Sequence, residues 1–224
     1  MKLKLFATLL LSMLCLAPAL AKKKPDVKCV LTLNDGKKVE GWYMKASYGT
    51  YGPENVKNMD EITITATKGG KDGTTYHAND VKKLVCTNEE TGDVKEYWSL
   101  YAIKALTHPE NMKPSGHKYF WLVVYQGKYV TGFLSVSSWT YGTMGRETST
   151  PCSYCIDGDN IAVTFFVPTN AITIGLRANL KYRFKRFPKM VDYLDSKELK
   201  LKDIKKDPFV LLEQLDRILS NEQL

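Results

Sequence analysis

The stretch VKCVLTLNDGKKVEGWYM, Val27–Met44, predicts the β-hairpin that begins the folded chain. Its Asp35-Gly36 pair separates two runs rich in apolar and β-branched residues, and a type I′ turn needs two residues that tolerate positive φ. Cys29, Leu31 and Leu33 share one face of the first run at the strand period of two. We therefore expect that face to be buried in a small β module.

The next segments extend this module, which we place at residues 22–95. EITITAT, residues 61–67, alternates isoleucines with threonines and is typical of a half-exposed strand. In the last run of the module Leu84 and Cys86 share a face. Short strands this close together, separated by glycine-rich turns, predict a small antiparallel barrel or rolled sheet.

A second hairpin, YFWLVVYQ against YVTGFLSV, opens a second β module at residues 118–177. Apolar residues fill both faces of its first strand, so we expect that strand to be central and covered on both sides. CSYCI and IAVTFFV flank a DGDN turn, and AITIGL, residues 171–176, predicts one more strand. Between the modules we interpret residues 96–117 as a connector, because residues 94–106 fit both the helical and the strand period.

The remaining residues, 178–224, predict helices. Pro188 must break the first apolar run and suits the first turn of a new helix. Asp207 followed by Pro208 is a good helix start. The residues after it form an apolar stripe: Leu211, Leu212, Leu215, Ile218 and Leu219. The expected fold class is therefore mainly β (α+β), with two small antiparallel β modules of barrel or rolled-sheet type and a C-terminal helical cap over one face of the sheet.

The first 21 residues, MKLKLFATLLLSMLCLAPALA, have the pattern of a secretory signal peptide, with two lysines, an apolar run and small residues before the cleavage site. We expect cleavage between Ala21 and Lys22, so that the mature protein is exported and is periplasmic or extracellular. A bilayer span needs about 20 apolar residues. Neither this run nor any later one reaches that length, so we expect no transmembrane segment in the mature chain.

The chain carries 32 basic and 24 acidic residues, which gives a formal net charge of +8. From Lys181 to Lys206 the lysines are interleaved with acidic residues, which indicates a solvated face. Nucleic-acid binding would need basic residues on one surface, with aromatic side chains to stack on bases. We therefore expect no nucleic-acid partner.

Short motifs in the chain resemble those of a large group of uncharacterised secreted proteins from gut bacteria of the order Bacteroidales. They are LTLNDGKKVEGW with the later YHANDVKKLV, the hairpin VVYQGKYVTGFLSV, and the closing FKRFPKMVDYLDSKELKLKDI. The chain departs from that group by ending in LDRILSNEQL and by carrying the CSYC pair. The resemblance implies an exported bacterial protein of two β modules with terminal helices, and it implies no known activity.

The sequence has five cysteines, and removal of Cys15 with the signal peptide would leave four. An oxidising compartment favours the pairing of these four as disulfides. Cys29 and Cys86 each lie on the apolar face of a strand in one module, so we expect them to pair, which leaves Cys152 with Cys155. In a regular strand these last two would lie on opposite faces about 10 Å apart, whereas a disulfide needs Cα atoms within about 7 Å. Their bond therefore requires a turn at the preceding proline.

The CSYC pair also raises an alternative function, a thiol-disulfide redox protein or enzyme that uses Cys152 and Cys155. Such chemistry needs a helix after the first cysteine, whose dipole lowers the thiol pKa, and a β-rich run follows instead. A zinc site would need two histidines beside the cysteine pair. The three histidines of the sequence, His77, His108 and His117, lack the regular spacing of a zinc finger. We expect no metal and no cofactor.

The sequence contains no Gly-x-Ser-x-Gly elbow and no metal-binding histidine pair at helical spacing. Carboxylates from distant positions can still meet in space, and the candidates are Glu40, Asp60, Asp80 and Glu96. Aromatic residues on polar loops favour instead the binding of a protein or a glycan. The candidate binding loop carries Trp139 and Tyr141, and the early aromatic residues are Trp42, Tyr43, Tyr48 and Tyr51. We therefore expect a non-catalytic binding or assembly module whose partner is a protein or glycan of the cell envelope.

Overall fold

The predicted first hairpin is formed by strands β1 (Val27–Leu33) and β2 (Lys38–Tyr43). The computed structural model describes residues 26–44, 60–103, 113–135, 151–168 and 175–222. The hairpin loop comprises residues 34–36 rather than the expected Asp35-Gly36 pair, because Leu33 N donates to Lys37 O at 2.9 Å and Gly36 N donates to Leu33 O at 3.0 Å. Gly36 has φ 86°, and a three-residue loop that ends in a left-handed glycine also fits the twist of the strands.

Three further strands complete the first module: β3 (Glu61–Thr65), β4 (Gly73–His77) and β5 (Val81–Asn88). They form an antiparallel sheet with the order β5-β1-β2-β3-β4. Cys29 and Leu31 of β1 face the core together with Leu84 and Cys86 of β5, and all four side chains are 0% exposed. The buried face expected for the hairpin is therefore confirmed.

Strand β6 (Val94–Ile103) joins the two modules and differs from the connector expected at residues 96–117. Its first half pairs with β5, and residues 97–101 pair with strand β7 (Lys118–Gln126). Tyr97 packs in the core of the first module, whereas Leu100 and Ala102 pack inside the second. Because both faces of the strand are covered, its apolar residues show no clear period of two.

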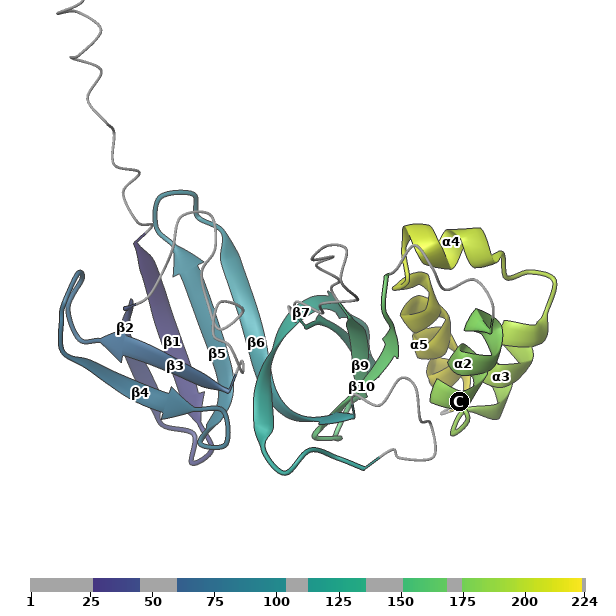
Figure 1. Cartoon of the computed structure of the whole chain (residues 1–224), viewed down its shortest axis with the longest axis horizontal. Coiled ribbons are helices and arrows are strands. Elements are labelled where there is room, and N and C mark those ends of the chain that lie inside the picture. Colours follow the sequence, from purple (N-terminus) through teal and green to yellow (C-terminus); the bar gives the residue numbers. More distant parts are fainter. Residues whose placement is uncertain (1–25, 45–59, 104–112, 136–150, 169–174, 223–224) are drawn as a thin grey trace, which may run out of the picture.

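The second module is a small closed barrel of β6, β7 and three more strands, β8 (Val130–Leu134), β9 (Cys152–Ile156) and β10 (Ile161–Phe166). Consecutive strands are antiparallel, and β10 closes the barrel by parallel pairing with residues 101–103 of β6. The buried residues inside the barrel are Leu100, Ala102, Trp121, Phe133, Cys155 and Ala162. Figure 1 shows the barrel end-on, as a ring between the first module and the C-terminal helices.

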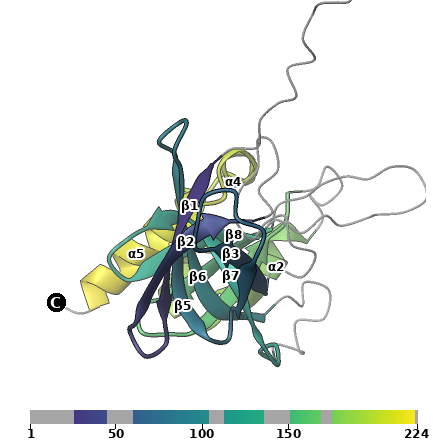
Figure 2. The same ribbon diagram turned by 90° about the vertical axis from the view of Figure 1, so that its left-hand side faces the viewer.

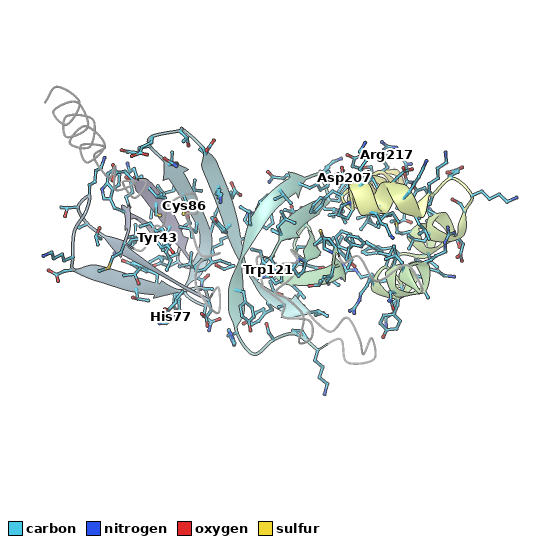
Figure 3. All side chains as sticks on the ribbon, turned by 45° about the horizontal axis from the view of Figure 1, so that its top comes forward. Tyr43, His77, Cys86, Trp121, Asp207 and Arg217 are labelled. Carbon is cyan, nitrogen blue, oxygen red and sulfur yellow. The ribbon has the colours of Figure 1, made fainter. Side chains whose placement is uncertain are left out.

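The first half of β7 is covered on both sides, as expected, whereas Val124 in its second half is 43% exposed. Phe120 is 0% exposed and packs in the core of the first module, while Trp121 is 1% exposed and packs inside the barrel. The indole Nε1 of Trp121 donates to Leu100 O at 3.1 Å. Trp121 lies where the two modules meet (Figure 3). Adjacent residues of one strand thus belong to two different cores.

The described part of the C-terminal region forms four helices: α2 (Leu176–Arg183), α3 (Pro188–Asp195), α4 (Leu201–Lys206) and α5 (Val210–Glu222). Pro188 occupies the first turn of α3, as expected. The predicted apolar stripe of α5 is buried against the barrel, with Leu219 partly buried at its end. It approaches β8 at Gly132, where a Cβ would lie 2.7 Å from Leu212 Cδ1. Figure 2, in which the first module faces the viewer, shows α5 leading out to the C-terminus behind it. The expected fold class is confirmed.

The expected strand at residues 171–176 and the expected signal peptide lie wholly or partly outside the described residues. The strand expected at residues 171–176 does not include Leu176, which is the first residue of α2, and residues 171–174 lie outside the described part. The signal peptide and its cleavage site between Ala21 and Lys22 also lie outside it. Among the helices that the structure describes, none combines the length and the apolar content needed to cross a membrane.

The carboxylate of Asp216 on α5 holds the loop between β7 and β8. It accepts hydrogen bonds from the backbone N–H groups of Lys128 at 3.1 Å, Tyr129 at 2.7 Å and Val130 at 3.1 Å. A Cβ added to Gly127 would lie 2.6 Å from Asp216 Cγ. One side chain therefore links the C-terminal helix to a barrel hairpin.

The Asp216→Ala variant should lower the free energy of unfolding by about 2 kcal/mol, because charge-assisted hydrogen bonds to the loop are lost. Gly127→Ala should destabilise the wild-type protein, because the new Cβ would clash with the Asp216 carboxylate. It should have much less effect in the Asp216→Ala background, where that carboxylate is absent. Urea unfolding of the four proteins measures this coupling. Glu213→Ala, on the exposed face of the same helix, serves as the control. Equal effects of Gly127→Ala in both backgrounds would contradict the contact.

Candidate functional site

The two cysteines of CSYC lie on opposite faces of β9. Cys152 packs against the helices outside the barrel, and Cys155 packs inside it. The pairing with β8 continues to Pro151, whose carbonyl accepts a hydrogen bond from Ser135 N at 3.0 Å. The turn on which a Cys152–Cys155 disulfide depends is therefore absent, and the expected bond is wrong. The DGDN turn expected after the pair does join β9 to β10, with Gly158 at φ 81°.

Burial also keeps both thiols protonated. It raises the pKa of Cys152 to about 12, with a smaller contribution from Asp207. It likewise raises the pKa of Cys155 to about 11. Because the thiolate is the nucleophilic form, neither group is activated at neutral pH. The burial of both thiols favours a packing role for them, and the redox alternative stays a prediction.

Cys29 and Cys86 face each other in the core of the first module. They are register partners on β1 and β5, and each is 0% exposed. Their Sγ atoms lie 3.3 Å apart, which is longer than a disulfide bond of about 2.05 Å. Figure 3 shows Cys86 within this module. The expected partners are thus adjacent, in the form of two thiols.

The carboxylates proposed from the sequence do not converge on one cleft. Glu40 and Glu96 lie on different strands, and Asp80 is exposed in the turn between β4 and β5. Lys28 Nζ lies 3.0 Å from Glu40 Oε2, and Lys83 Nζ lies 2.7 Å from Glu96 Oε1. The Nε2 atom of His117 lies 3.8 Å from Asp60 Oδ2. Glu40 and Glu96 are thus each paired with a lysine of a neighbouring strand, as surface carboxylates commonly are.

The remaining sequence candidates are divided between the described and the undescribed residues. Within the described ranges no three or more His, Cys, Asp and Glu side chains group together to hold a metal ion, and His77 and His117 are exposed. Of the early aromatic residues, Tyr43 is buried and Trp42 lies with Lys68 Nζ 5.3 Å from its ring centroid. The other candidates lie outside the described residues: His108, Tyr48, Tyr51, Trp139 and Tyr141.

A groove of about 880 Å³ lies between α2 and α3. Its apolar lining includes Leu176, Pro188, Val191 and Leu201. The ring of Tyr182 also lines it, with Lys185 Nζ 4.3 Å from the ring centroid and 3.0 Å from the phenolic oxygen. At its edge Lys181 Nζ lies 2.6 Å from Asp195 Oδ2. The groove thus offers an aromatic face together with hydrogen-bond donors and acceptors.

A smaller cavity of about 170 Å³ lies between the C-terminal end of α2 and the turn joining β9 to β10. Its apolar walls are Ile103, Ile156, Ile161 and Val163, and its charged lining is Arg183, Lys185, Arg186 and Asp159. Arg186 Nη2 lies 2.8 Å from Asp159 Oδ2, and these two side chains are 49% and 41% exposed. The ion pair therefore stands at the solvent side of the cavity.

The position of Arg183 beside this cavity follows from packing around Tyr154 of β9. The Tyr154 hydroxyl donates to Arg183 O at 3.0 Å, and its ring stacks on Phe184 with centroids 5.0 Å apart. These contacts hold the end of α2 on the barrel and leave Arg183 only 3% exposed. Burial lowers the pKa of Arg183, yet a guanidinium stays charged at neutral pH.

Sequence reasoning missed both hollows, although a local signal exists. The stretch LRANLKYRFKRF, residues 176–187, contains basic residues and no acidic ones. Its charge is hidden when the whole run from Lys181 to Lys206 is considered, because acidic residues follow in α3 and α4. Which of these cations line a hollow depends on the packing of α2 against the barrel. No protein-family model, no curated protein and no solved structure matches the chain.

Proposed function

We propose that the chain is an exported bacterial envelope protein with a non-catalytic binding function, and that the groove between α2 and α3 is its contact surface. The observation that carries this proposal is the composition of the groove. It combines apolar walls, the ring of Tyr182 and the oppositely charged pair of Lys181 and Asp195. Export, expected from the signal peptide, would bring this surface to ligands of the cell envelope.

A glycan suits this groove better than an apolar protein surface does. The C–H faces of sugars can pack on an aromatic ring such as that of Tyr182, and sugar hydroxyls can hydrogen-bond to the ammonium of Lys181 and the carboxylate of Asp195. The cations of α2 would further favour a glycan that contains acidic sugars. We therefore propose a glycan of the envelope as the partner.

Replacing Tyr182 by alanine tests this proposal. Glycan-array binding by the purified protein should fall about tenfold, which corresponds to about 1.4 kcal/mol, since the stacking face is removed. Tyr101→Ala is a matched control, because Tyr101 also lies beneath a lysine, with Lys118 Nζ 5.8 Å from its ring, but on β6. Thermal unfolding of both variants should resemble that of the wild type. Equal glycan binding by wild type and Tyr182→Ala would sink the proposal, and capture of an envelope protein alone would replace the glycan with a protein partner.

We also propose that Cys29 and Cys86 form a disulfide once the chain reaches an oxidising compartment. Directly opposite residues on antiparallel strands have Cα atoms about 4.5 to 5.5 Å apart, which is within the range that disulfides require. Their register and the 3.3 Å between their Sγ atoms support this pairing. The alternative of a redox enzyme built on Cys152 and Cys155 has less support, since their thiols are buried on opposite faces of β9.

A further inference from the structure

The cavity at the C-terminal end of α2 combines positive charge with apolar walls. Arg183 and Arg186 contribute two guanidinium groups to its lining, and Asp159 contributes one carboxylate. Lys185 also lines it, but its Nζ lies 3.0 Å from the hydroxyl oxygen of Tyr182, a residue of the groove. Asp159 is engaged by Arg186 at 2.8 Å, so the lining as a whole keeps an excess of positive charge. Such an excess in a partly enclosed, low-dielectric space attracts an anion more strongly than the same charges would on an open surface.

The planar guanidinium groups favour a carboxylate as the bound anion. Arginine donates parallel N–H bonds to the two oxygens of a carboxylate, which fixes the orientation of the ligand as well as its charge. Arg186 already donates one hydrogen bond to Asp159, from Nη2 to Oδ2 at 2.8 Å, and Arg183 lines the same cavity from the buried side. A bound carboxylate would therefore take the place that Asp159 partly occupies.

The other walls decide which oxyanion fits. Ile103, Ile156, Ile161 and Val163 offer no hydrogen bonds from their side chains. A phosphate, which carries oxygens on every side, would leave some of them desolvated against these residues. A ligand with one charged end and a short hydrocarbon tail meets both kinds of wall. The volume of about 170 Å³ is below the range of about 300 to 1,000 Å³ for drug-sized ligands, so the tail must be short.

We infer that this cavity binds a small monocarboxylate, with its carboxylate toward Arg183 and Arg186 and its hydrocarbon tail against the isoleucine wall. The inference goes beyond the glycan groove. The two hollows share Lys185 but no other lining residue. Either site can therefore fail without the other.

Butyrate titrated into the purified protein and followed by NMR is the test. We expect saturable binding with a Kd on the order of 1 mM, and no binding of butyramide, the neutral isostere. Arg186→Gln should weaken butyrate binding about tenfold. Asp159→Asn should strengthen it about threefold or more, because the competing carboxylate is removed while Arg186 remains. Lys181→Gln, which removes one positive charge from the groove side of α2, should leave the butyrate affinity unchanged.

The opposite signs expected for Arg186→Gln and Asp159→Asn separate a bound carboxylate from a general change in protein charge. The inference is overturned if butyramide binds as well as butyrate, or if Arg186→Gln and Lys181→Gln have the same effect. It is also overturned if inorganic phosphate binds more tightly than butyrate. Lys181 lines the groove only, whereas Tyr182 contacts Lys185, which lines both hollows, so Lys181→Gln is the variant that separates this result from the fate of the proposed glycan site.

Discussion

Trp121→Ala should lower the free energy of unfolding by about 3–5 kcal/mol. The side chain is 1% exposed and fills the interior of the barrel, so its removal leaves a large cavity there. The substitution also removes the hydrogen bond from the indole to Leu100 O, which joins β7 to β6. Both losses fall at the point where the two modules share strands.

Urea unfolding followed by far-UV circular dichroism measures this effect. Val124→Ala is the matched control, since Val124 lies on the same strand and is 43% exposed, and it should change stability by less than about 1 kcal/mol. Trp121→Phe should recover part of the loss, because it refills much of the space without the hydrogen bond. A cost for Trp121→Ala no larger than that of Val124→Ala would contradict the described core. We also expect one transition for both modules, because Phe120 and Trp121 anchor adjacent residues of β7 in two cores.

Reduction of the oxidised protein should lower its stability by about 4 kcal/mol through loss of the Cys29–Cys86 bond that we propose. The two residues are 57 positions apart, so the bond would constrain a long loop in the unfolded chain. Formation of the bond releases two protons and two electrons, which an oxidant of the disulfide class, such as oxidised glutathione, accepts. Since both thiols are 0% exposed, oxidation should occur before or during folding.

A peptide map without reduction should join the segment containing Cys29 to the segment containing Cys86. Cys152 and Cys155 should be alkylated in the same sample, but only after denaturation, because their burial raises both thiol pKa values. The Cys29→Ala/Cys86→Ala variant should be insensitive to reductant, whereas the Cys155→Ala variant should keep the sensitivity of the wild type. Recovery of Cys29 and Cys86 as alkylated thiols from exported protein would rule out the bond.

Much of the fold follows from local sequence patterns. The alternation at Cys29 and Leu31 predicts a buried strand face, and Pro188 opens α3 as its fixed φ requires. The apolar residues on both faces of residues 119–126 predict a central strand, and β7 is one. These predictions succeed because each depends on the backbone preference or the periodicity of one segment.

The predictions that differ from the structure concern segments whose conformation depends on contacts with distant parts of the chain. Residues 94–103 have no clear period because β6 serves two cores, and neither core is visible in the local sequence. The loop of the first hairpin spans three residues although Asp35-Gly36 suits a shorter one. The Cys152–Cys155 bond is wrong because β9 continues through its first cysteine as a paired strand.

Residue types at short spacing are enough to predict the β-rich class, the first hairpin, the paired face of Cys29 and Cys86, and the apolar stripe of α5. They do not predict that β6 belongs to two modules or that Arg183 and Arg186 meet the β9–β10 turn at a cavity, which only the folded chain shows. The physical reason is that a cavity and its charge depend on contacts between segments far apart in the chain. Residue 103 and residues 156–163 reach the end of α2 only when the barrel closes and the helices pack on it.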